Sequence, residues 1–295
     1  MTAAGPVGVL AIDKPVGPTS HDVVGMARRG LRTRRVGHTG TLDPFASGLL
    51  LLCVGPATRL SSHLTDLEKE YVAEALLGTR TDSHDLDGTV LEVVPDVEVS
   101  AASVEAALAA LAGEQMQVPP AFSAKKVKGE AAHRRARRGE EVELPPVPVV
   151  VHEIECLEVE GLRVSFRVRC SSGTYIRAIA RDLGEALGVG AHLTALRRTA
   201  VGGFSVDDAL GVDALDAVPP SAWITPADAV RRAGLSWFEV GEGASAELAQ
   251  GRVIPLGELR GSESATTAAL EAGRLLALGE VTERGFQPRK VFVGS

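Results

Sequence analysis

The chain is poor in cysteine and in aromatic side chains, and the first shortage bears on its compartment. Its three cysteines, Cys53, Cys156 and Cys170, are odd in number and show no Cys-x-x-Cys spacing. That pattern argues against both a disulfide framework and a zinc site. It favours a protein of the reducing cytoplasm, where free thiols persist.

Long apolar runs are missing as well. The longest, Leu49 to Val54, is far too short to cross a bilayer, and residues 1–9 lack the basic and apolar regions of a secretory signal. Because 45% of the 295 residues are hydrophobic, there is still ample material for a packed core. We therefore expect a globular protein without a membrane segment, built as one large domain or as a large domain plus a small one.

Signature motifs of several common enzyme classes are absent. The sequence contains no Gly-x-Gly-x-x-Gly after a strand, no phosphate loop ending in Gly-Lys-Ser/Thr, no Gly-x-Ser-x-Gly elbow and no His-Glu-x-x-His. Nicotinamide, ATP and zinc chemistry therefore lose support. We expect a function that uses neither a cofactor nor a metal ion.

Charge of both signs is present but is unevenly distributed. The 31 basic and 38 acidic residues give a formal net charge of −7. Residues 23–42 and 161–181 each hold five arginines and no acid, and residues 125–138 hold seven basic residues and one acid. Such segregation suits a protein with one phosphate-binding face. Each run could also be a merely solvated surface, and composition leaves both interpretations open.

Hydrophobic spacing predicts several elements along the chain. Buried or alternating apolar residues predict strands at 7–12, 69–77 and 162–170, and residues 48–54 form a continuous apolar run. Helical spacing after a capping residue predicts helices that begin at Thr19 or Ser20, at Ser100 and near Ile176. In the strand 162–170, the apolar residues alternate with arginines, so one face is expected to be buried and the other basic.

Proline clusters suggest how the chain is divided. Residues 118–148 are irregular and have prolines at both ends, which predicts an insertion. Pro219, Pro220 and Pro226 mark a predicted linker. We therefore expect a large domain over residues 1–224 and a small β-rich domain over 225–295, with short strands at 275–281 and 290–293.

Asp43 stands in an unusual setting, at the end of the run Arg-Arg-Val-Gly-His-Thr-Gly-Thr-Leu-Asp. Pro44 keeps it out of helical dihedrals, and the nearest preceding charges are cationic. A carboxylate beside a phosphate-binding patch would weaken RNA binding unless it had another task, such as nucleophilic attack or the positioning of a base. An Asx-turn or a helix cap would also explain this residue, and position alone favours that structural role.

The same ambiguity holds for His38 and for Tyr71 and Tyr175, the only two tyrosines. His38 could be a loop residue bonded to a carbonyl, or it could stack on or displace a base in a flipped-nucleotide mechanism. The tyrosines could simply pack and bond through their hydroxyls. The residue types alone do not decide.

Six motifs taken together resemble one family. They are Ile12–Pro15, Gly37–Gly48, Lys69–Tyr71, Thr81–Gly88, Ser172–Arg177 and His192–Arg198. In order and spacing they closely resemble the TruB family of tRNA pseudouridine synthases, over about residues 7–206. The departures are small, since Thr41, Phe45 and Ser47 stand where relatives often have Ala, Leu and Thr.

The resemblance implies an α/β (α+β) fold, with a pseudouridine synthase core built on a central, mostly antiparallel mixed sheet flanked by helices. It implies a small PUA-like domain at the C-terminus, although the tail is harder to match. The implied activity is the cofactor-free isomerisation of uridine 55 in the T-loop of tRNA to pseudouridine. The implied partner is therefore tRNA, bound through its T-loop and arm, without a protein partner or a membrane.

The resemblance also implies roles for individual residues. Asp43 would be the catalytic aspartate, Arg177 its ion-pair partner and Tyr71 the aromatic that stacks on the target base. Further residues would contribute to substrate binding, namely Lys14 and Tyr175 in the pocket, Leu196 in its apolar wall and His38 in the space left by flipped bases. Whether Asp43 attacks C1′ or removes a ribose proton is open at this stage.

The basic runs would hold the RNA backbone while the target base is extruded from its loop. We expect the run at 28–35 and the arginines Arg134, Arg135, Arg137 and Arg138 of the insertion to contribute, with an affinity that falls as salt rises. Because only 4% of the residues are aromatic, shape and phosphate contacts should outweigh stacking.

Three other functions fit parts of the sequence. The chain could be a non-catalytic tRNA-binding or tRNA-folding chaperone, or a pseudouridine synthase that depends on a guide RNA. A carboxylate-dependent nucleoside hydrolase would need a second acid beside Asp43; Asp82, Asp85 and Asp87 are available, but they more plausibly organise their own turn. The compact chain favours the stand-alone enzyme, with a monomer as the default oligomeric state.

Overall fold

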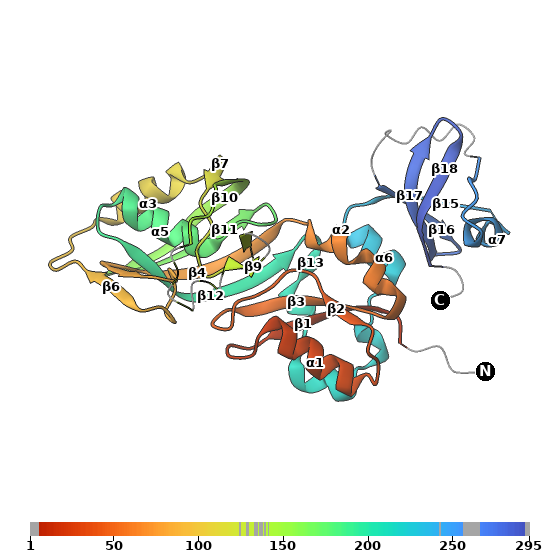
Figure 1. Ribbon diagram of the computed structural model, residues 1–295, viewed down its shortest axis with the longest axis horizontal. Helices are drawn as coiled ribbons and strands as arrows, with labels where there is room; N and C mark the ends of the chain where they lie inside the picture. The colour runs from red at the N-terminus through yellow and green to blue at the C-terminus, as the bar shows by residue number, and fades with distance from the viewer. Residues whose placement is uncertain are drawn as a thin grey trace. The chain divides into compact units, whose positions relative to one another are not determined.

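The computed structural model describes residues 6–123, 125–127, 130–132, 135, 138, 140, 142–241, 243–255 and 266–292 (Figure 1). The chain forms two compact units. Unit 1 comprises Met1–Asp43, Gly48–Leu67 and Val201–Ser295, and unit 2 comprises Pro44–Ser47 and Glu68–Ala200.

The N-terminal part of unit 1 is built around a fully buried strand. Its elements are β1 (Gly8–Lys14), α1 (Ser20–Gly30), β2 (Val36–His38), β3 (Ser47–Val54), η1 (Gly55–Leu60) and α2 (Ser61–Thr65). Both β1 and β2 pair with β3 in antiparallel fashion. Every residue of β3 from Gly48 to Val54 is buried, as expected for an apolar run covered on both faces.

Helix α1 begins with a capping box. The Thr19 side chain accepts a hydrogen bond from the backbone N–H of Asp22, and the Asp22 carboxylate accepts one from the backbone N–H of Thr19. Of the two caps that the sequence allows, Thr19 therefore takes the role, and Ser20 is the first residue of the helix. The hydroxyl of Ser20 is thereby left for another use.

The C-terminal part of unit 1 is β-rich, as predicted. Its elements are β13 (Phe204–Ser205), η2 (Val206–Asp208), β14 (Leu210–Gly211), η3 (Val212–Asp216), η4 (Pro220–Ala222), α6 (Pro226–Arg232), β15 (Ser236–Glu239), α7 (Ala244–Ala249), β16 (Thr266–Glu271), β17 (Arg274–Thr282) and β18 (Gly285–Val291). Strands β15 to β18 form a four-stranded sheet in sequence order, with β15 and β16 parallel and the other pairs antiparallel.

The stretch expected to be a linker carries short helices instead. Pro226 is the first residue of α6, where its missing N–H costs nothing, and Ala227, Ala229 and Val230 of that helix are buried. These residues join one apolar core with β1, β3 and the C-terminal strands β16 and β17. Both sides of the expected domain boundary at residues 224 and 225 thus belong to unit 1, and the division into two domains stays a prediction.

The described residues of unit 2 form a sheet that carries helices α3 and α5, together with two short strand pairs. Its elements are β4 (Lys69–Leu77), β5 (Thr79–Thr81), β6 (Val90–Val93), α3 (Ala101–Ala110), β7 (Gly113–Gln117), β8 (Lys126–Val127), β9 (Glu130–Ala131), β10 (Val147–Glu160), β11 (Arg163–Cys170), α5 (Ile176–Ala186) and β12 (Ala191–Val201). The strand order is β12, β4, β11, β10, β7, and the pairs β4–β11, β11–β10 and β10–β7 are antiparallel. Helix α3 packs on β10 and α5 packs on β4 (Figure 1). The expected fold class, mixed α/β with mostly antiparallel pairing, is confirmed.

Candidate active site

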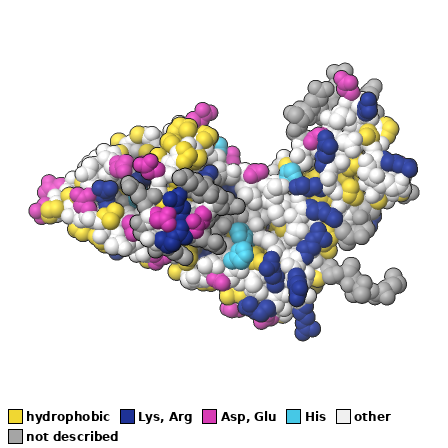
Figure 2. Space-filling view, viewed as in Figure 1, with side chains coloured by type: hydrophobic (Ala, Val, Ile, Leu, Met, Phe, Trp, Pro, Cys, Tyr) yellow, Lys and Arg dark blue, Asp and Glu magenta, His cyan; other side chains and the backbone are white. Residues whose placement is uncertain are grey.

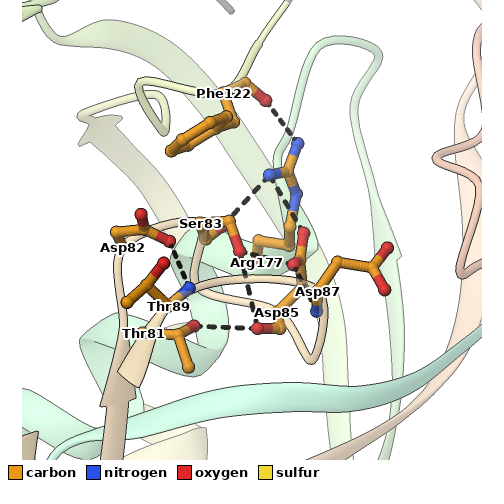
Figure 3. A network of polar contacts seen from close by, with 8 residues as sticks. All are labelled: Thr81, Asp82, Ser83, Asp85, Asp87, Thr89, Phe122 and Arg177. Carbon is orange, nitrogen blue, oxygen red and sulfur yellow. Dashed lines mark hydrogen bonds and ion pairs between the residues drawn. The ribbon is translucent and has the colours of Figure 1, made fainter. Parts of the chain in front are cut away.

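Arg177 is the best-defined residue of the candidate site. It lies in the first turn of α5, and only 4% of its surface is exposed. Its Nη1 lies 3.2 Å from an Asp85 carboxylate oxygen and donates to the carbonyl of Ser83 at 3.0 Å (Figure 3). Its Nη2 donates to the carbonyl of Phe122 at 2.8 Å. The guanidinium therefore joins the acidic turn to the segment that follows β7.

The acidic turn between β5 and β6 is held by its own side chains. The Thr81 hydroxyl donates to the Asp85 carbonyl at 2.8 Å, and the backbone N–H of Thr89 donates to Asp82 at 2.9 Å (Figure 3). One oxygen of Asp85 accepts from the Ser83 hydroxyl and from the backbone N–H of Asp87, while the other faces Arg177. The interpretation that Asp82 and Asp85 organise this turn agrees with these contacts.

The pairing of Arg177 with Asp85 is almost entirely shielded from water. Their side chains are 5% and 7% exposed. A buried ion pair gains little net stability, but removing one member leaves an uncompensated charge and costs about 3–5 kcal/mol. The turn and the helix are therefore locked to each other at this point, and Arg177 cannot swing to another rotamer without breaking three contacts.

Other expected site residues of unit 2 lie on neighbouring elements. Tyr71 is 8% exposed on β4 and stands opposite Val168 of β11, and Leu196 is 8% exposed on β12. Tyr175 is the residue before the first turn of α5. The buried Gln117 side chain accepts from the N–H of Tyr175 at 2.8 Å and donates to its carbonyl at 3.2 Å. The backbone of Tyr175 is thus fixed two residues before Arg177.

In unit 1, the segment that carries Asp43 is held next to α1. The Ser20 hydroxyl accepts from the backbone N–H of Leu42 at 2.8 Å and donates to the Leu42 carbonyl at 3.1 Å. Leu42 is 3% exposed, and Asp43 follows it directly. Three residues earlier, the backbone N–H of Thr39 donates to Leu51 of β3 at 3.1 Å. The segment is therefore tied to both the helix and the sheet of unit 1.

Lys14 and His38, the residues of unit 1 expected to contribute to the pocket, lie at the ends of β1 and β2. Lys14 is fully buried, and its ammonium donates to the carbonyls of Pro15 at 3.0 Å and Pro18 at 2.8 Å. It thereby closes the turn between β1 and α1. The ring of His38 meets the ring of His21 edge to face, with 6.2 Å between the centroids.

Asp43 belongs to unit 1, whereas Arg177, Tyr71, Tyr175 and Leu196 belong to unit 2. Their expected convergence around one uridine stays a prediction. Sequence reasoning missed two residues that fix the backbone beside expected site residues. The sequence predicts for Ser20 only a role as a helix cap, and it gives no signal for Gln117, because the partner of Gln117 lies 58 positions away in the chain.

The arginines expected to hold RNA in the insertion are partly matched by carboxylates. Arg135 pairs with Glu140 at 2.7 Å, and Arg138 pairs with both Glu130 and Glu140 at 2.7 Å. Arg134 and Arg137 lie outside the described residues. RNA phosphates would have to compete with these glutamates for the arginines. The role of this run in binding therefore stays a prediction.

The basic face of β11 is also matched by acids. Arg163 pairs with Glu74 at 2.6 Å, Arg169 pairs with Glu68 at 2.9 Å, and Arg167 pairs with Glu155. These glutamates lie on β4, on β10 or just before β4, so the charge run that is acid-free in sequence is close to neutral in space. The arginines of residues 28–35 differ, because none of them pairs with a carboxylate in the part of the chain that the structure describes. Figure 2 shows Lys and Arg side chains gathered over the part of unit 1 that carries α1.

Among the described residues, no three His, Cys, Asp or Glu side chains are grouped so that they could hold a metal ion. No helix in the described ranges is long and apolar enough to cross a membrane.

Two family models match the chain. Residues 28–176 match the N-terminal domain of TruB family pseudouridylate synthases, and residues 177–221 match the C-terminal domain of tRNA pseudouridylate synthase B. A protein named tRNA pseudouridine synthase B from Thermobifida fusca is 45% identical, with 98% of this chain and 99% of that protein covered. The protein of the same name from Corynebacterium aurimucosum is 44% identical, with 97% and 95% covered.

Solved structures are similar in fold. An H/ACA ribonucleoprotein bound to a substrate RNA containing 2′-deoxyuridine contains a chain with a TM-score of 0.75 and 27% identity, covering 97% of this chain and 85% of that one. A chain of an archaeal box H/ACA complex gives a TM-score of 0.73 and the same identity, with 97% and 86% covered.

Proposed function

The chain belongs to the TruB family of pseudouridylate synthases and is an isomerase that forms pseudouridine in tRNA, and we propose that its target is uridine 55 in the T-loop. In this reaction, the bond from C1′ to N1 breaks, the uracil turns, and C1′ bonds to C5. The proton on C5 is lost and N1 gains one, so no electron or external group is exchanged. The residues alone can supply this chemistry.

We place Asp43 at the centre of the reaction. A carboxylate can attack C1′ or take a ribose proton, and either role requires that it stays ionised beside the flipped nucleotide. The observation that supports this proposal is that each expected partner is held in place within its own unit: the segment before Asp43 through Leu42, and buried Arg177 by Asp85, Ser83 and Phe122. A fixed guanidinium would keep a facing carboxylate ionised and oriented.

The remaining site residues would recognise the extruded base. Tyr71 would stack on it, Leu196 would form the apolar wall, and Lys14 and Tyr175 would support the pocket. His38 would fill the space that the base leaves. We place the T-loop and arm of the tRNA against this pocket, with the arginines of 28–35 and of the insertion on its phosphates, and we take the enzyme to be a cytoplasmic monomer.

A guide-RNA-dependent synthase is the second candidate, since the similar solved chains belong to H/ACA complexes. Their identity to this chain is 27%, whereas the relatives named tRNA pseudouridine synthase B reach 44–45% over nearly their whole length. The higher identity favours the stand-alone enzyme, which would act on tRNA without a second RNA.

Tritium release tests the proposal directly. The purified protein, without metal or nucleotide, is incubated with an unmodified tRNA transcript tritiated at C5 of every uridine. We expect release of about one equivalent, no release with Asp43→Asn, and wild-type release with the control Asp213→Asn, an exposed carboxylate of η3.

A second transcript, with cytidine in place of uridine 55, tests the position. Release from this transcript would contradict the proposed target, and release by Asp43→Asn would contradict the proposed residue. Tight binding of tRNA by wild-type protein without any release would support the chaperone function instead.

A further inference from the structure

Ser20 is the first residue of α1, but its hydroxyl makes contacts outside that helix. Thr19 already caps α1, so the Ser20 side chain is not used at the helix end. It reaches instead to Leu42, 22 positions along the chain, where it bonds both the N–H and the carbonyl of one residue. A serine hydroxyl can donate one hydrogen bond and accept another, and Leu42 uses both capacities.

The helix end that carries Ser20 is itself firmly placed. The Thr19–Asp22 capping box fixes its first turn, and Lys14 closes the turn that leads into it. At the other end of α1, a Cβ on Gly30 would lie 2.3 Å from the carbonyl oxygen of Leu215, so the helix lies in close contact with η3. Ser20, which is 1% exposed, therefore holds Leu42 from a rigid support.

The segment that receives this contact ends at Asp43. Leu42 is buried, and Pro44 limits the backbone of Asp43 to extended conformations. A shift of Leu42 must therefore pass to Asp43, the next residue. We propose that Ser20 is a positioning residue for Asp43, acting through the backbone of Leu42 and without touching substrate. This inference rests on the proposed role of Asp43.

Loss of the hydroxyl should slow the chemical step rather than weaken tRNA binding. Ser20→Ala leaves both backbone groups of buried Leu42 without this partner, so the segment must move to find others. A displacement of the reacting group by about 1 Å can cost on the order of 100-fold in rate. The surfaces that hold the RNA are unchanged, so the affinity should stay close to that of the wild type.

A neighbouring threonine offers a matched control. Thr19→Ala also removes one hydroxyl at the start of α1, and it should lower the melting temperature by a few degrees through loss of the cap. It leaves the Ser20–Leu42 contact in place. The rate of tritium release is measured under single turnover with saturating enzyme, together with tRNA affinity and thermal unfolding, for Ser20→Ala, Ser20→Thr and Thr19→Ala.

We expect the single-turnover rate of Ser20→Ala to fall about 10- to 100-fold, with tRNA affinity within about twofold of wild type. Thr19→Ala should keep a rate within about threefold of wild type, although its melting temperature falls through loss of the cap. Ser20→Thr, which keeps the hydroxyl, should recover most of the rate. Equal rates for Ser20→Ala and Thr19→Ala would overturn the proposal, because the hydroxyl would then act only through the helix. An error in the proposed role of Asp43 would be detected separately, because the variant Asp43→Asn would then remain active.

Discussion

Two regions of the chain hold the same number of arginines, but the surroundings of these arginines differ. In the segment 28–35 of unit 1, the five arginines have no carboxylate partner among the described residues. In the region 163–181 of unit 2, which spans β11 and the start of α5, each of the five arginines lies within 4 Å of a carboxylate oxygen. A charge run in the sequence is therefore a poor measure of the charge that a ligand meets.

The cause of the difference is the local architecture. The arginines of β11 stand in a sheet, where the neighbouring strands β10 and β4 bring glutamates alongside them. The segment 28–35 runs from the end of α1 into a loop, where Arg28 donates to the carbonyl of Val36 and Arg35 to the hydroxyl of Thr58. Neutral oxygens satisfy these donors without cancelling their charge, so the segment keeps its positive potential.

The largest effect is expected at Arg177, the buried arginine of the second region. A lysine at this position keeps the charge but cannot reach Asp85, Ser83 and Phe122 at once in the geometry of a guanidinium. We expect Arg177→Lys to lower the single-turnover rate of pseudouridine formation by about 100-fold or more. Arg167→Lys, at an exposed ion pair of β11, is the control and should stay within about twofold. A rate for Arg177→Lys above a tenth of wild type would show that only the charge matters.

A smaller effect is expected when charge is removed from the surface of each region. Arg29, Arg32 and Arg34, all exposed, are replaced together by glutamine, and Arg163, Arg167 and Arg169 are replaced together in a second protein. Both variants lose three positive charges, so an effect of net charge alone would be equal. We expect the first to weaken tRNA binding about 10-fold at 0.1 M salt and to reduce the salt slope by about two, and the second to change little. Equal losses in the two variants would remove the distinction between the regions.

The sequence predicted elements better than it predicted contacts. Strand β4, the alternation along β11 and the capped helix α3 follow from short-range periodicity, which a linear pattern records. The linker expected at Pro226 was wrong in detail, because a proline is as compatible with the first turn of a helix as with a linker. The contacts of Arg177, Ser20 and Gln117 join residues 22 to 94 positions apart, and no local pattern encodes such pairs.

The smallest effect is expected in the pH dependence of stability. It tests whether an arginine of the second region still shifts the pKa of a neighbouring group although a carboxylate pairs with it. His84 lies in the acidic turn with φ +60°, and burial lowers its pKa to about 4, with Arg181, Arg177 and Arg80 adding to the shift. The unfolded chain therefore binds a proton as pH falls below 6.5, whereas the folded chain does not until about pH 4. Stability must fall with pH across this window, by at most about 3 kcal/mol.

Urea unfolding between pH 4.5 and 7.5 measures this loss against His84→Asn, because asparagine tolerates the same backbone conformation and does not titrate. We expect the wild type to lose stability relative to His84→Asn as pH falls, and the loss to shrink in Arg181→Gln, where one cation beside His84 is gone. Arg181 is paired with Asp182 at 2.7 Å. If that carboxylate cancelled its field completely, Arg181→Gln would keep the wild-type profile. A weaker dependence of stability on pH in Arg181→Gln would show instead that His84 still responds to the charge of Arg181. Pairing would then reduce the charge that an RNA phosphate meets at the surface without removing the effect of the arginine inside the fold.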